Sequence, residues 1–280
     1  MPLVNMKDLL ENANREMYGV GAFNVANMEM VLGAVRAGEE CRSPIILQLS
    51  QGRLPYSPLF LMGPMMMAAA ETASVPIGVH FDHGTDIEVI RQALDLGFTS
   101  VMIDASHLPI DRNIELTGKV KEMADQYGAS VEAEVGQLGG SEDDSAARKM
   151  YHSDPQEAKR LYDGVKIDAI ALSIGNAHGL YLDEPKLDFS LLQEAKALIP
   201  IPLVLHGGTG ISPEDFRTCI ACGVRKINIA TADFLSAEEG ARNYCAGTER
   251  NWFKLSEAMV QGVAACVARH IRIFQSDGKA

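Results

Sequence analysis

The stretch PLVLHGGTGISPEDFRTCIACGVRKINIAT (202–231) contains a complete strand–helix–strand unit. The apolar runs at its two ends are typical of strands that are buried on both faces. Between them, Ser212 supplies an N-cap, Pro213 suits the first helical position, and Gly223 closes the helix. Two such strands joined by one helix predict a pair of parallel strands with a crossover connection.

Similar units follow one another along the chain. Eight of them within about 230 residues favour a (β/α)8 TIM barrel. A doubly wound sheet is the alternative, but it would usually carry a glycine-rich loop after its first strand, and GVGAFNV has its glycines at the start. The expected strands are 19–25, 44–50, 77–82, 100–105, 130–136, 169–175, 202–208 and 226–231. The expected helices are 27–40, 64–74, 86–97, 111–128, 154–164, 188–198 and 212–223.

The chain shows no internal boundary. No linker rich in Pro, Gly or Ser divides it, so we expect a single domain, residues 1–280. An amphipathic segment from Asn251 onward predicts one further C-terminal helix, which could cover the barrel or serve a subunit interface.

The charge balance restricts the choice of partners. The chain has 25 Lys and Arg residues against 37 Asp and Glu residues, a formal net charge of −12. This balance argues against nucleic acid or an anionic membrane as a partner. The segment MPLVNMKDLLENANRE lacks the basic-then-apolar order of a signal peptide, and no apolar run approaches membrane-spanning length. We therefore expect a cytoplasmic protein.

Polar side chains lie at the C-terminal ends of the expected strands, where barrel enzymes carry their chemistry. Three of them are histidines, in the segments VHFDHG, SIGNAHG and LVLHGGTG. Three imidazoles at one end of three strands predict a metal site with an open coordination position, as in catalytic zinc centres. Any one of these polar residues could instead cap a turn, but all eight strands contribute. The set comprises Asn24, Ser50, Asp82, His83, Asp104, Glu134, His178, His206 and Asn228.

Glycines surround the last two histidines of this set. Glycine lets backbone amides approach an anion closely, and the loops after the seventh and eighth strands often bind phosphate in such barrels. A metal beside a phosphate cradle predicts a phosphorylated substrate whose carbonyl or enolate the metal polarises. The residues expected to form the cradle are Gly179, Gly207, Gly208, Asn228 and Thr231.

A long polar segment, GQLGGSEDDSAARKMYHSD (136–154), separates the fifth and sixth strands. Its paired glycines and acidic residues are typical of a mobile lid, although an ordinary surface loop can have the same composition. As part of a lid, Glu142 could swing into the site as an acid–base group.

These motifs resemble those of the class II, metal-dependent ketose-bisphosphate aldolases, the fructose- and tagatose-1,6-bisphosphate enzymes. The matching segments are AFNV, SPIILQLS, HFDHG, SVMIDASHLP, VEAEVGQLGGSEDD, GNAHGLY, PLVLHGGTGI and KINIAT, in order along essentially the whole chain. The resemblance implies reversible cleavage of a ketose 1,6-bisphosphate, or of a related ketose 1-phosphate, to dihydroxyacetone phosphate and an aldehyde. It also implies a phosphorylated sugar as the substrate and a homodimer or homotetramer.

The resemblance also assigns metal ligands. His83, His178 and His206 match the family's ligands for one catalytic Zn²⁺, which polarises the C2 carbonyl and stabilises the enediolate. Asp104 and Glu134 match positions near an alternative, buried metal position.

Roles in proton transfer and substrate binding follow from the same resemblance. Asp82 matches the residue that removes the C4 hydroxyl proton in cleavage, and Glu142 matches the mobile-loop group that handles the proton at the enediolate carbon. The positions that match substrate contacts are Asn24, Ser50 and Asn228. Those that match contacts to the C1 phosphate and to a monovalent cation (Na⁺ or K⁺) are Gly179, Gly207 and Thr209.

Three positions bear on the substrate. Leu182 stands where many fructose-type members have a lysine, and Ala230 stands where they often have Asp or Asn, so both resemble the tagatose-type branch. The family's arginine segment for the distal phosphate has no clear match, since Arg250 aligns poorly. The substrate therefore stays open between a 1,6-bisphosphate of either type and a ketose 1-phosphate with a different tail.

Three other functions fit these residues less well. A Schiff-base aldolase needs a lysine at a strand end, whereas Lys166 and Lys226 are expected to precede their strands, on the wrong face of the barrel. A metal-dependent hydrolase would commonly show His-x-His on the first strand, and AFNV has none. A non-catalytic barrel that stabilises another subunit is the remaining alternative, but Asp82 and Glu142 are both intact beside the ligands.

Overall fold

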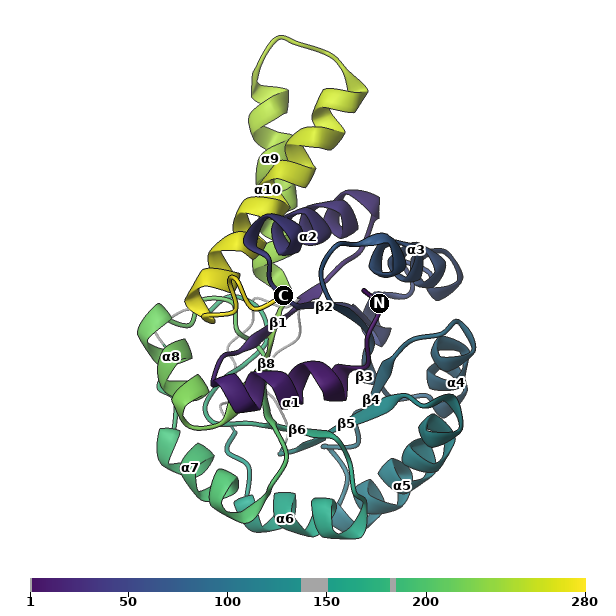
Figure 1. The fold of residues 1–280 in the computed structure, drawn as a ribbon, viewed down its shortest axis with the longest axis vertical. Coiled ribbons are helices and arrows are strands. Elements are labelled where there is room, and N and C mark those ends of the chain that lie inside the picture. Colours follow the sequence, from purple (N-terminus) through teal and green to yellow (C-terminus); the bar gives the residue numbers. More distant parts are fainter. Residues whose placement is uncertain (1, 137–150, 182–184) are drawn as a thin grey trace.

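The computed structural model describes residues 2–136, 151–181 and 185–280. Eight parallel strands close into a barrel in sequential order, and helices surround it (Figure 1). The predicted (β/α)8 barrel is therefore confirmed. The strands are β1 (Val20–Asn24), β2 (Ile45–Ser50), β3 (Ile77–Gly84), β4 (Ser100–Ile103), β5 (Ser130–Val135), β6 (Ala169–Leu172), β7 (Leu203–Leu205) and β8 (Val224–Ile229).

The helices of the described residues include every one that was predicted. They are α1 (Met6–Glu16), α2 (Met28–Cys41), α3 (Leu59–Thr72), α4 (Ile87–Asp95), α5 (Ile110–Tyr127), α6 (Pro155–Gly164), α7 (Phe189–Leu198), α8 (Pro213–Ala221), α9 (Thr231–Ala246) and α10 (Trp252–Ile273), with a 3-10 turn η1 (Gln51–Arg53). Within this part of the chain, no helix is both long and apolar enough to cross a bilayer.

Some boundaries differ from the prediction for identifiable reasons. Helix α3 begins at Leu59 rather than at Pro64, because Leu59 and Met62 bury their side chains in the core and extend the helix ahead of the proline. Strands β6 and β7 stop three residues earlier than expected, because the chain turns at Gly175 and Gly207, where φ is 93° and 61°.

Helix α1, which was not predicted, covers one end of the barrel (Figure 1). Its apolar stripe, Met6, Leu9, Leu10 and Ala13, is fully or almost fully buried. These side chains form one cluster with inward-facing strand residues. The strand residues of this cluster are Val20, Ala22, Ile46, Ala169, Ala171 and Val204. Because this end is packed with apolar side chains, the chemistry is confined to the opposite end, where the strands finish.

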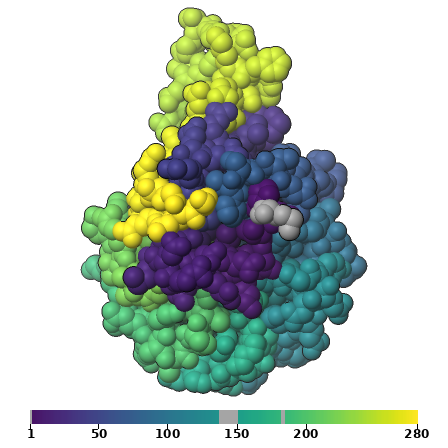
Figure 2. Space-filling model, viewed as in Figure 1, coloured from purple at the N-terminus to yellow at the C-terminus, as the bar shows by residue number. Residues whose placement is uncertain are grey.

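Helices α9 and α10 form an arm that projects from the barrel (Figures 1 and 2). The predicted C-terminal helix is α10, whereas α9 was not predicted. The C-terminal half of α10 is buried against the body of the protein, and its N-terminal half pairs with α9. The two helices approach closely at glycines: a Cβ on Gly240 would lie 2.3 Å from the Ala258 carbonyl oxygen, and one on Gly262 would lie 2.3 Å from that of Ser236.

This close approach predicts the effect of adding one methyl group. Gly262→Ala should lower the free energy of unfolding by about 1–3 kcal/mol, because the helices must move apart to accommodate it. Gly118→Ala, in helix α5, is the matched control. Its new Cβ would meet no neighbouring atom closer than 3.7 Å, and that nearest atom belongs to Val165. The control should be neutral or more stable by up to about 1 kcal/mol. Urea denaturation followed by circular dichroism measures both, and equal stability of the two variants would contradict the arm packing.

Candidate active site

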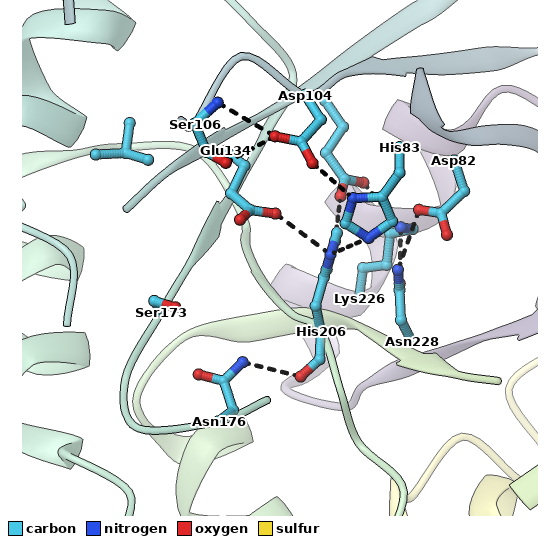
Figure 3. Close-up of polar contacts among 12 residues, drawn as sticks. Asp82, His83, Asp104, Ser106, Glu134, Ser173, Asn176, His206, Lys226 and Asn228 are labelled. Carbon is cyan, nitrogen blue, oxygen red and sulfur yellow. Dashed lines mark hydrogen bonds and ion pairs between the residues drawn. The ribbon is translucent and has the colours of Figure 1, made fainter. Parts of the chain in front are cut away.

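Predicted strand-end residues lie close together in the structure, among them Asp82, His83, Asp104, Glu134, His206 and Asn228 (Figure 3). Asn24 and Ser50 are the last residues of β1 and β2, and Asp104 and His206 directly follow β4 and β7. His178 lies further along the loop after β6 and still reaches His83, with ring centroids 4.9 Å apart. The barrel therefore brings together residues that are distant in the sequence.

Strand β3 supplies two adjacent site residues, Asp82 and His83. Neighbouring residues of a regular strand point to opposite faces. Here the pairing of β3 with β4 shifts register between Phe81 and Gly84, and His83 takes a left-handed backbone conformation with φ of 46°. Such a bulge redirects a side chain. It lets both Asp82 and His83 face the site.

The three histidine rings converge on one point. The centroid of His83 lies 4.6 Å from that of His206, and the centroids of His178 and His206 are 6.0 Å apart. One nitrogen from each ring lies within 4.8 Å of the others. The closest pair is His83 Nε2 and His206 Nδ1, at 3.0 Å.

The carboxylates of Asp104 and Glu132 hold two of these rings by hydrogen bonds. Asp104 accepts a hydrogen bond from His83 Nδ1 at 2.9 Å, and Glu132 accepts one from His206 Nε2 at 2.8 Å. The inner nitrogens, His83 Nε2 and His206 Nδ1, then carry lone pairs that face each other. Two nitrogens this close need a proton or a metal cation between them, and Zn²⁺ binds imidazole nitrogen at about 2.0–2.1 Å. The donor set therefore fits a zinc ion.

The charges around His83 also favour a cation at this point. Burial acts to lower the pKa of His83, but the carboxylates of Asp82 and Asp104 outweigh it and raise that pKa well above its usual range. The pKa of His178 moves well below its usual range, because of burial and then the charge of His83. The pocket thus stabilises positive charge at its centre.

A second group of donors adjoins the first. His83, Asp104 and Glu134 also have ligand atoms within 4.8 Å of one another. Glu134 is buried, and its Oε2 has no hydrogen-bond partner among the described residues. Burial, and then the charge of Asp104, raise the pKa of Glu134 well above its usual range. This cluster is where the sequence analysis expected an alternative metal position.

Three amide side chains surround the carboxylate of Asp82. Asn24 and Gln48 each donate to Oδ2 at 3.3 Å, and Asn228 donates to Oδ1 at 3.3 Å. Burial acts to raise the pKa of Asp82, but the positive charges of His83 and Lys226 outweigh it and lower that pKa. Asp82 is therefore ionised and held in one orientation.

The predicted phosphate cradle forms a small pocket beside the histidines. Gly207 has a left-handed conformation, and a Cβ there would lie 2.2 Å from the Ala177 carbonyl oxygen, so only glycine fits. Thr231 begins helix α9, and Thr209 accepts a hydrogen bond from Ala232 N at 3.0 Å. Backbone N–H groups at a helix N-terminus favour anions. The pocket is lined by His178, Gly179, Gly207, Gly208, Thr209, Asn228, Ala230 and Thr231.

Four further positions were named in the sequence analysis: Glu142, Leu182, Ala230 and Arg250. Glu142 and Leu182 lie outside the described residues, as does most of the expected lid. Ala230 lines the phosphate cradle. The turn between α9 and α10 lies at the far end of the arm from the barrel (Figure 1). Arg250 belongs to this turn, and its Nη1 donates to Gly247 O and Glu249 O.

One prediction was wrong. Lys226 does not precede its strand but lies inside β8, with its fully buried ammonium group in the barrel interior. The strand was expected to begin at Lys226, whereas β8 begins at Val224. Gln48 and Glu132 were missed, although both lie on predicted strands at inward-facing positions, Glu132 two residues before Glu134. This period of two was the signal that could have identified them.

Comparisons with known proteins agree with this geometry. The family model described as class-II fructose-bisphosphate aldolase matches residues 4–279. A fructose-bisphosphate aldolase from Geobacillus stearothermophilus is 40% identical over 286 aligned positions, which cover 100% of this chain and 99% of the relative. One from Staphylococcus epidermidis is 41% identical over 245 residues, 86% of each chain.

Solved structures give the same result. The YdjI aldolase from Escherichia coli K12 superposes with a TM-score of 0.90 at 32% identity, covering 99% of both chains. A putative fructose-1,6-bisphosphate aldolase from Coccidioides immitis also gives 0.90, at 30% identity over 98% of this chain and 97% of that one. The resemblance seen in the motifs is therefore confirmed: the chain belongs to the class II fructose-bisphosphate aldolase family, whose members are aldehyde-lyases.

Proposed function

We propose that this chain catalyses the reversible, metal-dependent cleavage of a ketose 1,6-bisphosphate of tagatose or fructose type, or of a related ketose 1-phosphate. The products are dihydroxyacetone phosphate and an aldehyde. The observation that carries the proposal is the convergence of three imidazoles beside the ionised Asp82 and a glycine-lined cradle. The names of the relatives from Geobacillus and Staphylococcus support the substrate class.

The metal site would be formed by His83, His178 and His206, with Asp104 and Glu134 offering an adjacent position. When bound there, zinc supplies a Lewis acid that polarises the substrate carbonyl and stabilises the negative charge of the enediolate. The protein's part is to keep the inner nitrogens of the three rings unprotonated and aimed at one point. The hydrogen bonds to Asp104 and Glu132 do this for two of the rings.

Asp82 would act as the base in cleavage. It takes the proton of the C4 hydroxyl while the C3–C4 bond breaks, so that C4 becomes the aldehyde carbon and the bonding electrons remain on the C3 side. Glu142 would then deliver a proton to C3, the enediolate carbon that keeps those electrons. In condensation the same protons move in reverse. The three amide donors around Asp82 support this role, because they orient its carboxylate without neutralising it.

The remaining site residues would bind the substrate. The backbone around Gly179, Gly207 and Gly208, together with Thr209 and Thr231, would hold the C1 phosphate and a monovalent cation, Na⁺ or K⁺. Asn24, Ser50 and Asn228 would contact the sugar. Local N–H groups suit this task in a chain whose net charge is −12, because backbone amides attract an anion irrespective of the total charge.

Several broader properties belong to the same proposal. We infer one domain over residues 1–280, a cytoplasmic location, and a homodimer or homotetramer. The non-catalytic alternative is disfavoured, because a barrel that only stabilised a partner would not need the ionised Asp82 within its amide cage.

The proposal predicts metal-dependent activity on at least one member of a ketose phosphate panel. The panel contains tagatose and fructose 1,6-bisphosphates and their 1-phosphates, and release of dihydroxyacetone phosphate is followed with a coupled dehydrogenase. Chelation should abolish activity and added Zn²⁺ should restore it. Cleavage of no panel member by the zinc-loaded enzyme, or activity that survives complete metal removal, would count against the proposal.

A second prediction concerns Asp82. Asp82→Ala should lower kcat by about 10²–10⁴-fold, the usual contribution of a positioned acid–base group. The variant should still bind one zinc ion per chain, measured by elemental analysis, because Asp82 is not among the three histidine ligands. Asp111→Ala, a change at an exposed site on α5, serves as the control and should keep wild-type kcat. A zinc-loaded Asp82→Ala enzyme with normal kcat would rule out the assigned role.

A further inference from the structure

The barrel holds an ion pair directly beneath the site. Lys226 Nζ lies 2.9 Å from Glu132 Oε2, and both side chains are completely buried. Glu132 lies on β5 two residues before Glu134. Lys226 lies on β8 two residues before Asn228, and both of these are labelled in Figure 3. Removing two charges from water is costly, and such a pair adds little net stability compared with apolar residues of similar size.

Glu132 connects the pair to the metal site. Its Oε1 accepts the hydrogen bond from His206 Nε2 at 2.8 Å, while Oε2 faces Lys226 and lies 3.7 Å from His80 Nε2. Because its other oxygen faces the Lys226 ammonium group at 2.9 Å, the carboxylate serves as the acceptor in its bond with His206. It holds the proton of His206 on Nε2 and leaves Nδ1 for the metal.

Lys226 connects the ion pair to Asp82, the proposed base. Its ammonium group donates to Asn228 Oδ1 at 2.8 Å. An ammonium group has no acceptor, so the Asn228 amide must present its oxygen to Lys226 and its NH₂ group away from it. That NH₂ group donates to Asp82 Oδ1 at 3.3 Å. Without Lys226, the amide could rotate and turn its oxygen toward the Asp82 carboxylate, which would repel it.

We propose that Glu132 and Lys226 are positioning residues that act as one unit, Glu132 by setting the metal-binding nitrogen of His206 and Lys226 by setting the amide of Asn228 against Asp82. The inference rests on the proposed function for its catalytic half. Its metal half stands on the hydrogen bonds alone. Each residue supplies the opposite charge that compensates the other in the barrel interior, so the two roles depend on each other.

Single substitutions would leave one buried charge uncompensated, so double variants test the proposal. Glu132→Leu with Lys226→Met removes both charges and both hydrogen bonds, and replacing a buried pair by apolar residues usually preserves folding. Glu132→Gln with Lys226→Met is the matched control. Its Gln oxygen can still accept from His206 Nε2, while the link to Asn228 is lost.

Zinc affinity, measured by competition with a chromophoric chelator, tests the role of Glu132 without any substrate. The Leu/Met variant should bind Zn²⁺ about 10–100-fold more weakly than wild type, and the Gln/Met variant should recover most of that loss. Wild-type affinity in a folded Leu/Met variant would overturn the role of Glu132. So would a Gln/Met variant that binds zinc as weakly as Leu/Met.

The kcat measured at saturating zinc tests the role of Lys226. Both double variants should show kcat about 10²-fold below wild type, the scale of loss expected when a reacting group is misplaced. Wild-type kcat in either folded variant would overturn the role of Lys226. If Leu/Met does not fold, the Gln/Met variant alone decides this half. If the wild-type enzyme cleaves no ketose phosphate, the proposed function fails, while the zinc comparison still tests Glu132.

Discussion

The hydrogen bond between His206 and Glu132 lies where the barrel interior changes from apolar to charged. On one side of it, α1 and inward-facing residues such as Ala169 and Val204 fill the barrel. On the other side lie the histidines, Asp82 and the phosphate cradle. Glu132, His206 and Lys226 are fully buried, and their polar groups pair with one another and with Asn228. This network orients the ring of His206 and the amide that faces Asp82, and the site depends on that order.

Local backbone distortions place the functional atoms that regular strands could not. The bulge at His83 lets one strand contribute both a histidine of the proposed metal site and the neighbouring carboxylate. The left-handed turn at Gly207 shapes the proposed phosphate cradle, at a distance from Ala177 that excludes any side chain. Both distortions follow the regular part of a strand, which anchors them. The barrel thus provides rigidity and the strand ends provide the geometry.

Much of this could be predicted from the sequence because the pattern is local. Buried parallel strands are short apolar runs, so all eight were found, and the polar residue at the end of each was found with them. The missed features are those whose partners are distant in the chain. Gln48 and Glu132 have meaning only against Asp82 and His206, and Lys226 was misplaced because a lysine within a strand contradicts the apolar pattern. Helix α9 buries only Asp233 and Ala237 and has no clear apolar stripe, whereas the apolar stripe of α1 is a local pattern that was missed.

The sequence by itself determined the fold class, the three histidines, the carboxylate beside the first of them and the glycines of the cradle, since each depends on residue type and spacing. Only the tertiary structure decided which nitrogen of His206 faces the metal site, which atoms surround Asp82, and where Lys226 points. The reason is physical. Residue type fixes what a side chain can donate or accept, but closure of the barrel fixes which partner is within hydrogen-bond reach.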